Sequence, residues 1–209
     1  MKETEVREQV IEKMKEIYEM IKEKRNESEW IKENARVGLR KKRNDSNGIC
    51  RESLFENIEE YIYLTVDEKI SIIMTNDFNL IPKDLLWEVA TENSKRDISI
   101  KSIFKALKGI SDSLGTPMPE LPEIPEEEFP LYVVESSGRA FFDKETIRSA
   151  LNTNRVIVIP SSNKEILIQP CGEVSADELN YMNDTVRSVN ETLTPEEVLG
   201  DRAYVVDLK

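Results

Sequence analysis

Histidine is absent from this chain of 209 residues. Its absence excludes the serine–histidine and cysteine–histidine pairs that activate many hydrolytic nucleophiles, and it removes the histidine general base. It also removes the ligand that most catalytic zinc sites share. Catalysis by this chain would therefore depend on carboxylates, lysine, tyrosine or a bound cofactor, and the sequence indicates no cofactor.

Cysteine and glycine are scarce, and neither forms a motif. Cys50 and Cys171 lie far apart and show no metal-ligand spacing, so two reduced thiols are expected rather than a disulfide. The seven glycines form neither a G-x-G-x-x-G nor a Walker sequence, so nucleotide binding by those routes is not expected. The acidic residues show no calcium-loop spacing either, and no metal site is predicted.

Long apolar runs and positive charge are also lacking. No apolar run approaches the roughly 18 residues of a membrane helix, and the chain does not begin with a secretory signal, so a cytoplasmic protein without a membrane partner is expected. The 41 acidic residues outnumber the 29 basic ones, which gives a formal net charge of −12. Because affinity for nucleic acid comes largely from lysine and arginine, a broad nucleic-acid surface is disfavoured.

The first region, residues 1–52, is predicted to form an amphipathic helix followed by a basic loop. The helix covers residues 4–34 and is too short in its apolar repeat for a coiled coil, so it is expected to pack on its own body or on a second copy. Its apolar stripe comprises Val6, Val10, Met14, Ile17 and Ile21.

The basic loop covers residues 36–51 and carries six cations against one acid, Asp45. Such a stretch could meet nucleic acid or an acidic partner. The turn-forming sequence NDSNG favours a solvated loop over a binding element. The cations are Arg36, Arg40, Lys41, Lys42, Arg43 and Arg51.

Residues 53–115 are predicted to form a hairpin and helices. Apolar residues at helical spacing between 54 and 58 indicate a short helix, and two β-branched or aromatic runs within residues 61–76 predict a hairpin. One further helix is expected to start at Pro82 and end near Asn93. Another is expected to be capped by Ser99 and terminated by Gly115 in a left-handed conformation. After it, residues 116–130 contain five prolines among glutamates, which favours an extended connector over a ligand for a proline-binding partner.

The last region, residues 131–209, alternates strands and helices. The expected order is strand, helix, strand, strand, helix, strand, with Asp143 capping the first helix and the Ser175 to Glu178 spacing forming a capping box on the second. This β-α-β-β-α-β order is that of the split βαβ or ferredoxin-like arrangement, with a mixed or antiparallel sheet. The fold class predicted for the whole chain is therefore α+β with a helical N-terminal arm.

The tetrapeptide Ser161–Lys164 matches S-x-x-K, which in serine acyl enzymes brings a nucleophilic hydroxyl to a lysine base. That dyad requires the serine to begin a helix, whereas this segment follows Pro160 and separates two predicted strands. The companion S-D-N and K-T-G motifs are absent. A turn is therefore favoured over an active site. Its exposed residues form a candidate contact surface, namely Ser161, Ser162, Asn163, Lys164 and Glu165.

Four segments carry a resemblance to a known family. They are IIMTNDFNLIPKDLLWEVATENS, PLYVVES, VIVIPSSNKEILIQP and VNETLTPEEVLGDRAYVVD. Over residues 58–209 the chain resembles an uncharacterised bacterial family, a domain of unknown function. Its pattern has a Pro-Met-Tyr-Val strand, a Leu-Pro-Ser-Ser-x-His-Glu-Val turn and strand, and a Val-Asn-x-Thr followed by Glu-Glu-Val-Leu-Ser-Asp.

Two positions depart from that family pattern. Lys164 stands where the pattern has histidine, an exchange that moves the unperturbed pKa by about four units and weakens a catalytic interpretation of the turn. Gly200 stands where the pattern has serine. The family has no assigned activity, so the resemblance implies an architecture and no function.

These observations favour a non-catalytic cytoplasmic interaction or regulatory protein. Its partner would be an unknown protein or a second copy bound through the N-terminal helix. One alternative is a histidine-free hydrolase using Ser161 or Ser162 with Lys164. The other is nucleic-acid binding through the basic loop, residues 36–51.

Overall fold

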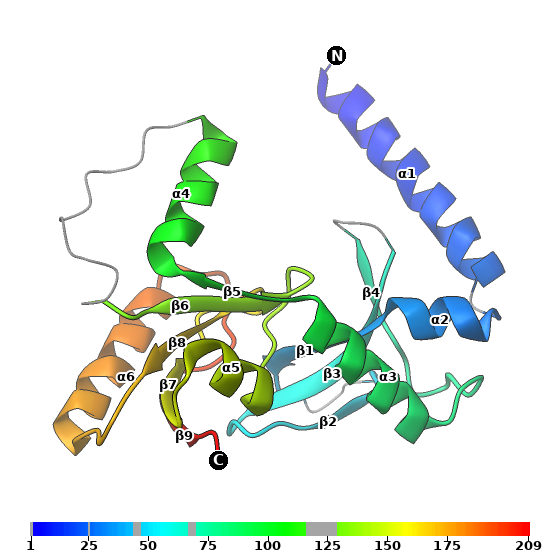
Figure 1. The fold of residues 1–209 in the computed structure, drawn as a ribbon. Helices are drawn as coiled ribbons and strands as arrows, with labels where there is room; N and C mark the ends of the chain where they lie inside the picture. Colours follow the sequence, from blue (N-terminus) through cyan, green and yellow to red (C-terminus); the bar gives the residue numbers. More distant parts are fainter. Residues whose placement is uncertain (1, 25, 44–46, 67–69, 116–128) are drawn as a thin grey trace.

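The computed structural model describes residues 2–24, 26–43, 47–66, 70–115 and 129–209 of the chain. The chain begins with helix α1, Lys2–Lys24, which projects from the body, and a short helix α2, Ser28–Asn34, leads into the first sheet (Figure 1). The single helix predicted over residues 4–34 is therefore wrong, because Glu27 is extended and begins a second helix. Two antiparallel sheets follow, so the predicted α+β class with an N-terminal helix is confirmed.

The first sheet is organised around one long central strand. Strand β3, Ile58–Thr65, lies between β1, Ala35–Lys41, and β2, Cys50–Glu52. Strand β4, Ser71–Ile73, also pairs with β3, which confirms the predicted hairpin.

The predicted basic loop is wrong for residues 36–41, which form β1, and for residues 50 and 51, which begin β2. Val37 and Leu39 are buried and point to the core, while Arg36 and Arg40 alternate with them. Gly38 lies opposite Tyr61 in register, and a Cβ atom added at Gly38 would stand 3.0 Å from the Tyr61 ring. The burial of these two aliphatic side chains therefore favours a strand, although the segment is basic in composition.

Helix α3, Lys83–Arg96, packs on the first sheet and builds its hydrophobic cluster. Pro82 precedes its first residue, as predicted, and the helix continues one turn beyond the expected end at Asn93. Leu86 and Ala90 are fully buried in this cluster. The remaining buried members include Ile31, Ala35, Val37, Ile49, Ile62, Leu64, Met74, Ile81 and Phe141.

The second sheet has five strands in the order β5-β6-β8-β7-β9. Its strands are β5, Ile98–Ser102; β6, Tyr132–Ser136; β7, Arg155–Ile159; β8, Ile166–Pro170; and β9, Tyr204–Asp207. Helices α4, Ile103–Leu114, α5, Lys144–Leu151, and α6, Ala176–Asn190, connect them.

The predicted β-α-β-β-α-β order is present as β6-α5-β7-β8-α6-β9. Strands β6 and β7 are both antiparallel to β8, which lies between them, so β6-α5-β7 is a split crossover. The unit β8-α6-β9 is split by β7 in the same way. The place beside β6 is taken by β5, a strand that the sequence did not predict.

Two local predictions between residues 53 and 115 are wrong. Residues 54–57 form turns rather than a helix, because Ile58 already pairs with Lys41 in the sheet. Ser99 lies inside β5, and the cap of α4 is Ser102, whose hydroxyl accepts a hydrogen bond from the Lys105 amide. Gly115 ends α4 with φ of 63°, as predicted. The proline-rich connector falls outside the described residues except for its last two, 129 and 130.

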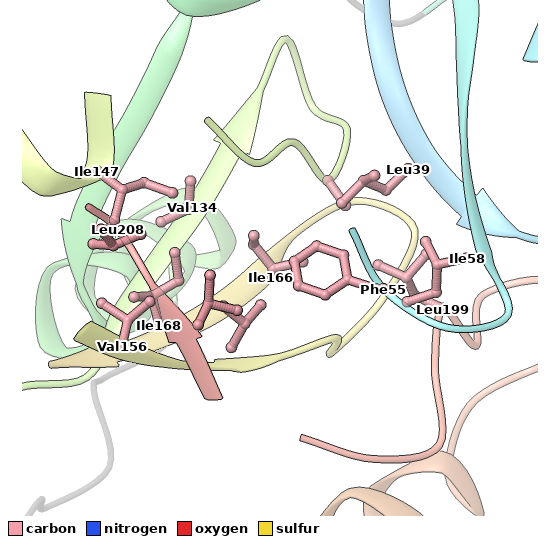
Figure 2. Packing of buried hydrophobic residues seen from close by; sticks show 13 residues of the cluster. Leu39, Phe55, Ile58, Val134, Ile147, Val156, Ile166, Ile168, Leu199 and Leu208 are labelled. Carbon is pink, nitrogen blue, oxygen red and sulfur yellow. The ribbon is translucent and has the colours of Figure 1, made fainter. Parts of the chain in front are cut away.

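One hydrophobic cluster joins the two sheets (Figure 2). Leu39, Phe55 and Ile58 from the first sheet and its turn pack against the inner face of the second sheet. That inner face is covered by α5 through Ile147, which is fully buried. The second sheet contributes Val134, Val156, Val158, Ile166, Ile168 and Val206.

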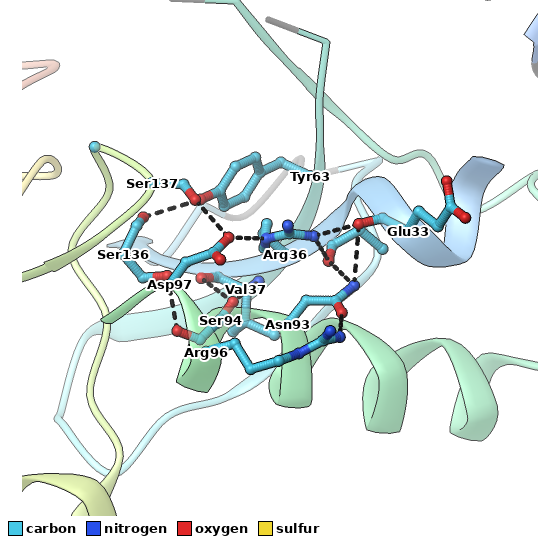
Figure 3. Close-up of polar contacts among 12 residues, drawn as sticks. Glu33, Arg36, Val37, Tyr63, Asn93, Ser94, Arg96, Asp97, Ser136 and Ser137 are labelled. Atoms are coloured by element: carbon cyan, nitrogen blue, oxygen red, sulfur yellow. Dashed lines mark hydrogen bonds and ion pairs between the residues drawn. The ribbon is translucent and has the colours of Figure 1, made fainter. Parts of the chain in front are cut away.

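A buried network of hydrogen bonds also joins the two sheets (Figure 3). The Tyr63 hydroxyl donates to the carbonyl oxygen of Ser136 at 3.1 Å, and the Ser136 hydroxyl donates to the carbonyl oxygen of Ser94 at 2.9 Å. The Ser94 hydroxyl accepts from the Val37 amide at 2.8 Å. Burial raises the pKa of Tyr63, so this hydroxyl remains a donor at neutral pH.

Candidate anion-binding pocket

A hollow of about 320 Å³ lies where the end of the first sheet meets the turns of the second. Five cationic side chains line it, together with three groups able to donate a hydrogen bond, one glutamate and an apolar wall. The cations are Arg40, Lys41, Lys42, Arg43 and Arg139; the other lining residues are Tyr61, Ser71, Ile73, Asn163, Pro195, Glu196 and Val198.

The N-terminal wall is the end of β1. Lys41 is the last residue of the strand, and Lys42 and Arg43 follow it with exposed side chains. The Lys42 amide donates to the carbonyl oxygen of Asn57 at 2.8 Å, so the chain stays fixed one residue beyond the strand. The Lys42 amine lies 3.3 Å from a carboxylate oxygen of Glu52, and both side chains are more than half exposed. Such an exposed pair contributes little stability and can yield to a ligand.

Arg40 forms the base of this wall and is held rigidly. Its Nε donates to Oε1 of Glu59 at 2.7 Å, and the two side chains are 11% and 8% exposed. Its guanidinium lies 5.0 Å from the centre of the Tyr61 ring, and Nη2 lies 3.0 Å from Sγ of Cys50. Arg40 therefore contributes a fixed positive charge whose orientation is set by the sheet.

Arg139 enters the pocket from a tight turn after β6. Ser136 and Arg139 exchange two backbone hydrogen bonds, and the residues between them, Ser137 and Gly138, have φ of 49° and 71°. Two central residues with positive φ are the signature of a type I′ turn. Nη2 of Arg139 donates to the Ser71 hydroxyl on β4 at 2.9 Å, which directs the guanidinium toward the first sheet.

Asn163 closes the pocket from the β7–β8 turn. Its Nδ2 donates to the carbonyl oxygen of Glu196 at 2.9 Å, and its amide donates to that of Glu197 at 3.0 Å. Its own carbonyl oxygen accepts from the Ala140 amide at 3.1 Å. The turn therefore anchors the C-terminal wall of the pocket beside the Arg139 turn. Within the described residues, Oδ1 of Asn163 is buried without a hydrogen-bond partner.

The charges converge on Tyr61. Burial raises the pKa of its hydroxyl, while the nearby Arg139, Arg40 and Arg43 oppose that rise in pKa. Three guanidinium groups, from β1, from the segment after it and from the turn after β6, thus lie near the same side chain. This is a local concentration of positive charge in a chain of net charge −12.

The five predicted contact residues of the β7–β8 turn do not line a single pocket. Only Asn163 lines the cationic pocket, whereas Ser161 lines an apolar groove beside α6. Glu165 lies near Glu135 on the outer face of the second sheet. Burial raises the pKa of Glu165, and the negative charge of Glu135 raises it further. The predicted contact surface is therefore divided among three environments.

The serine and lysine of the S-x-x-K sequence are arranged as a turn. The Ser162 hydroxyl accepts from the backbone amide of Lys164 at 3.1 Å, and the Lys164 amine lies 3.3 Å from Oε1 of Glu197. The pKa of Glu197 is lowered, first by its hydrogen bond from the Thr194 hydroxyl and then by Lys164. No hydrogen bond between a hydroxyl of Ser161 or Ser162 and the Lys164 amine occurs within the described part of the chain.

The remaining cations of the basic stretch have structural positions away from the pocket. Arg36 donates from Nε to the Asp97 carboxylate at 2.6 Å and from Nη1 to the carbonyl oxygen of Glu33 at 2.7 Å (Figure 3). Arg51 pairs with Glu60 at 2.6 Å and lies over the Trp87 ring at 4.2 Å. Only the cations at positions 40–43 converge on the pocket.

Comparisons with known proteins gave no match to this chain, whether among family models, curated proteins or solved structures. Among the described residues, no group of three or more acidic or cysteine side chains is placed to hold a metal ion. None of the helices described here is long and apolar enough to cross a membrane.

Sequence reasoning missed Arg139, Tyr61 and Ser71. Arg139 stands alone among uncharged neighbours in the sequence, and Ser71 lies in a short strand. Ser71 and Tyr61 come near the basic stretch through strand pairing within the first sheet, and Arg139 does so because the two sheets pack together. The Ser-Gly dipeptide at residues 137–138 predicts a turn just before Arg139. That signal does not show which strand the Arg139 side chain would contact.

Proposed function

We propose that this protein is a non-catalytic binding protein that recognises a phosphate monoester on a small ligand through the cationic pocket. The convergence of four cations from residues 40–43 with Arg139 around one hollow carries the proposal. Guanidinium and ammonium groups are the side chains that bind phosphate, and arginine can do so with two parallel hydrogen bonds. The hollow, about 320 Å³, lies at the small end of the range for ligand sites.

The arrangement of the cationic side chains favours a compact anion over an extended one. Nucleic acid binds by contacting several phosphates in succession along a basic surface. Here Arg36 and Arg51 do not line the pocket and pair with Asp97 and Glu60. The basic stretch therefore offers a single cluster rather than a continuous track, which supports a small ligand.

The position of Lys164 favours binding over hydrolysis. A serine–lysine dyad needs the lysine amine within hydrogen-bond reach of the serine hydroxyl. The Lys164 amine faces Glu197 at 3.3 Å. Its pairing supports the non-catalytic proposal over the histidine-free hydrolase.

The test is thermal unfolding in inorganic phosphate, compared with chloride at equal ionic strength. Phosphate is expected to raise the Tm of the natural chain, because a ligand that binds only the folded state stabilises it. The double variant Lys41→Gln/Arg43→Gln should lose this rise, since both side chains are exposed and line the pocket. Lys105→Gln, an exposed lysine on α4, is the matched control and should keep it.

Equal phosphate protection of the natural chain and the double variant would contradict the proposal, as would the absence of any protection. p-Nitrophenyl phosphate serves as a second probe. It is expected to bind without releasing nitrophenolate, so release of nitrophenolate that depends on Lys164 would favour the hydrolase. Tighter, steeply salt-dependent binding of a single-stranded oligonucleotide would favour nucleic acid instead.

A further inference from the structure

One carboxylate, that of Glu196, lines the cationic pocket together with the five cations. The residue is exposed, and its side chain forms no ion pair and accepts no hydrogen bond within the described residues. The cations therefore do not neutralise this carboxylate, although they line the same hollow. The pocket thus contains a cluster of positive charge and a separate negative group that is open to a ligand.

The backbone that carries Glu196 is held in place by its neighbours. Nδ2 of Asn163 donates to the carbonyl oxygen of Glu196 at 2.9 Å. The Thr194 hydroxyl donates to Oε2 of Glu197 at 3.0 Å, and the Glu197 amide donates to the carbonyl oxygen of Thr194 at 2.9 Å. The Glu197 carboxylate also lies 3.3 Å from the Lys164 amine, and Glu197 does not line the pocket. Of the two adjacent glutamates, only Glu196 is therefore available to a ligand in the pocket.

The Glu196 carboxylate affects which anions the pocket can bind. It opposes the attraction of the cations for a ligand that is negative throughout, because like charges repel. It attracts a ligand whose far end is positive, since a carboxylate and an ammonium group form a charge-assisted hydrogen bond. A repulsive and an attractive effect together give specificity. The charges of the pocket therefore favour a ligand that carries both signs.

The apolar lining of the pocket indicates what could join the two charged ends of such a ligand. Ile73, Pro195 and Val198 line the same hollow, and two of them are close to Glu196 in sequence. These side chains would contact carbon atoms between the phosphate and the positive group. The volume of about 320 Å³ favours a short aliphatic link over a large ring system or a polymer.

We infer that the pocket binds a small phosphorylated amine, with its phosphate on the cations and its ammonium group on Glu196. This assignment rests on the proposed function, because it names the chemical class of the ligand for the same pocket. An alkylamine is charged at neutral pH, since its usual pKa is about 10, as for lysine. A phosphate monoester has lost most of its second proton at that pH. Such a ligand therefore presents both charges at once.

The test is isothermal titration calorimetry with 2-aminoethyl phosphate and propyl phosphate at neutral pH and low ionic strength. Propyl phosphate has a methyl group in place of the ammonium group and is otherwise of similar size. The natural chain is expected to bind 2-aminoethyl phosphate about fivefold more tightly, the effect of an exposed ion pair at the upper end of its range. Glu196→Gln should remove this preference and bind propyl phosphate at least as tightly as the natural chain does. Glu191→Gln, an exposed glutamate outside the pocket, changes the net charge equally and should keep the preference.

The two ligands separate failure of this inference from failure of the proposed function. If neither compound binds the natural chain, the proposed function fails and the inference fails with it. If both bind with equal Kd, or propyl phosphate binds more tightly, the pocket recognises phosphate and only the inference is overturned. A Glu196→Gln variant that keeps the full preference would also overturn it, because the amine would then contact another group. Loss of propyl phosphate binding in this variant, with an unchanged urea midpoint, would likewise count against it.

Discussion

The ion pair between Arg40 and Glu59 should be strongly coupled, because the sheet buries it. The two residues lie directly opposite each other on β1 and β3, with Nε and Oε1 2.7 Å apart. Across the other edge of β3, Glu59 lies opposite Glu52. Arg40 therefore neutralises Glu59 at a position where a like charge, Glu52, lies across the strand pair.

The expected change in the free energy of unfolding follows from the burial of this ion pair. The two side chains are only 11% and 8% exposed, so removal of one partner leaves a desolvated charge. Arg40→Met or Glu59→Leu alone should cost about 3 kcal/mol or more in the free energy of unfolding, the lower end for a broken buried pair. The double variant replaces the pair with apolar side chains of similar length, and its unfolding free energy should return to within about 1 kcal/mol of the natural value.

The assay is a double-mutant cycle by urea unfolding, followed by the fluorescence of Trp30 and Trp87. Both tryptophans pack against the cluster of the first sheet, so they report on the region that carries the pair. The expected coupling energy is about 5 kcal/mol or more, close to the sum of the two single costs, because the double variant should lose no more than about 1 kcal/mol. If the double variant loses as much stability as the two single variants together, the pair is not coupled and Arg40 is not held in the way described.

Three further predictions concern other parts of the chain. Gly200→Ala should cost about 1–3 kcal/mol in urea unfolding by overpacking, because a Cβ there would stand 2.6 Å from Pro160 Cγ; an unchanged midpoint would refute the close contact. Asn93→Leu should cost about 1–3 kcal/mol, since its Nδ2 donates to the buried carbonyl oxygen of Ala35 at 3.0 Å; a neutral effect would show that the carbonyl finds another donor. Burial raises the pKa of Glu165 above its usual 4.5, so the stability contributed by its protonated form is present below that pH and lost as pH rises. Glu165→Gln should therefore raise Tm at pH 7 but not at pH 4, and an equal effect at both would contradict the raised pKa.

The C-terminal elements were predictable because their signals are local. Ser175 and Glu178 form the predicted capping box, and Asp143 caps α5 through the Thr146 amide at 2.9 Å. These interactions span three residues, so the sequence contains both partners side by side. The same holds for Gly115, whose left-handed conformation ends α4.

Strands β1 and β5 were missed because their evidence is not local. The segment ARVGLRK reads as a basic loop, and only its pairing with β3 shows that Val37 and Leu39 alternate into the core. The segment ISIKS is partly exposed along its length, and its assignment depends on pairing with β6 across the connector. Strand formation at a sheet edge depends on partners distant in sequence.

The cationic pocket also depends on residues that are distant in sequence, and this dependence determines when an anion could bind. Its cations come from β1 and from the turn after β6, and Leu39 and Ala140, next to Arg40 and Arg139, are buried in the cluster shared by both sheets. The Leu39 amide also donates to the carbonyl oxygen of Ala140 at 2.8 Å, so the two walls are fixed to each other by the backbone. An anion held between these walls would bind only while the sheets are packed together. Its binding free energy would therefore stabilise the packing of the two sheets as a whole rather than one loop.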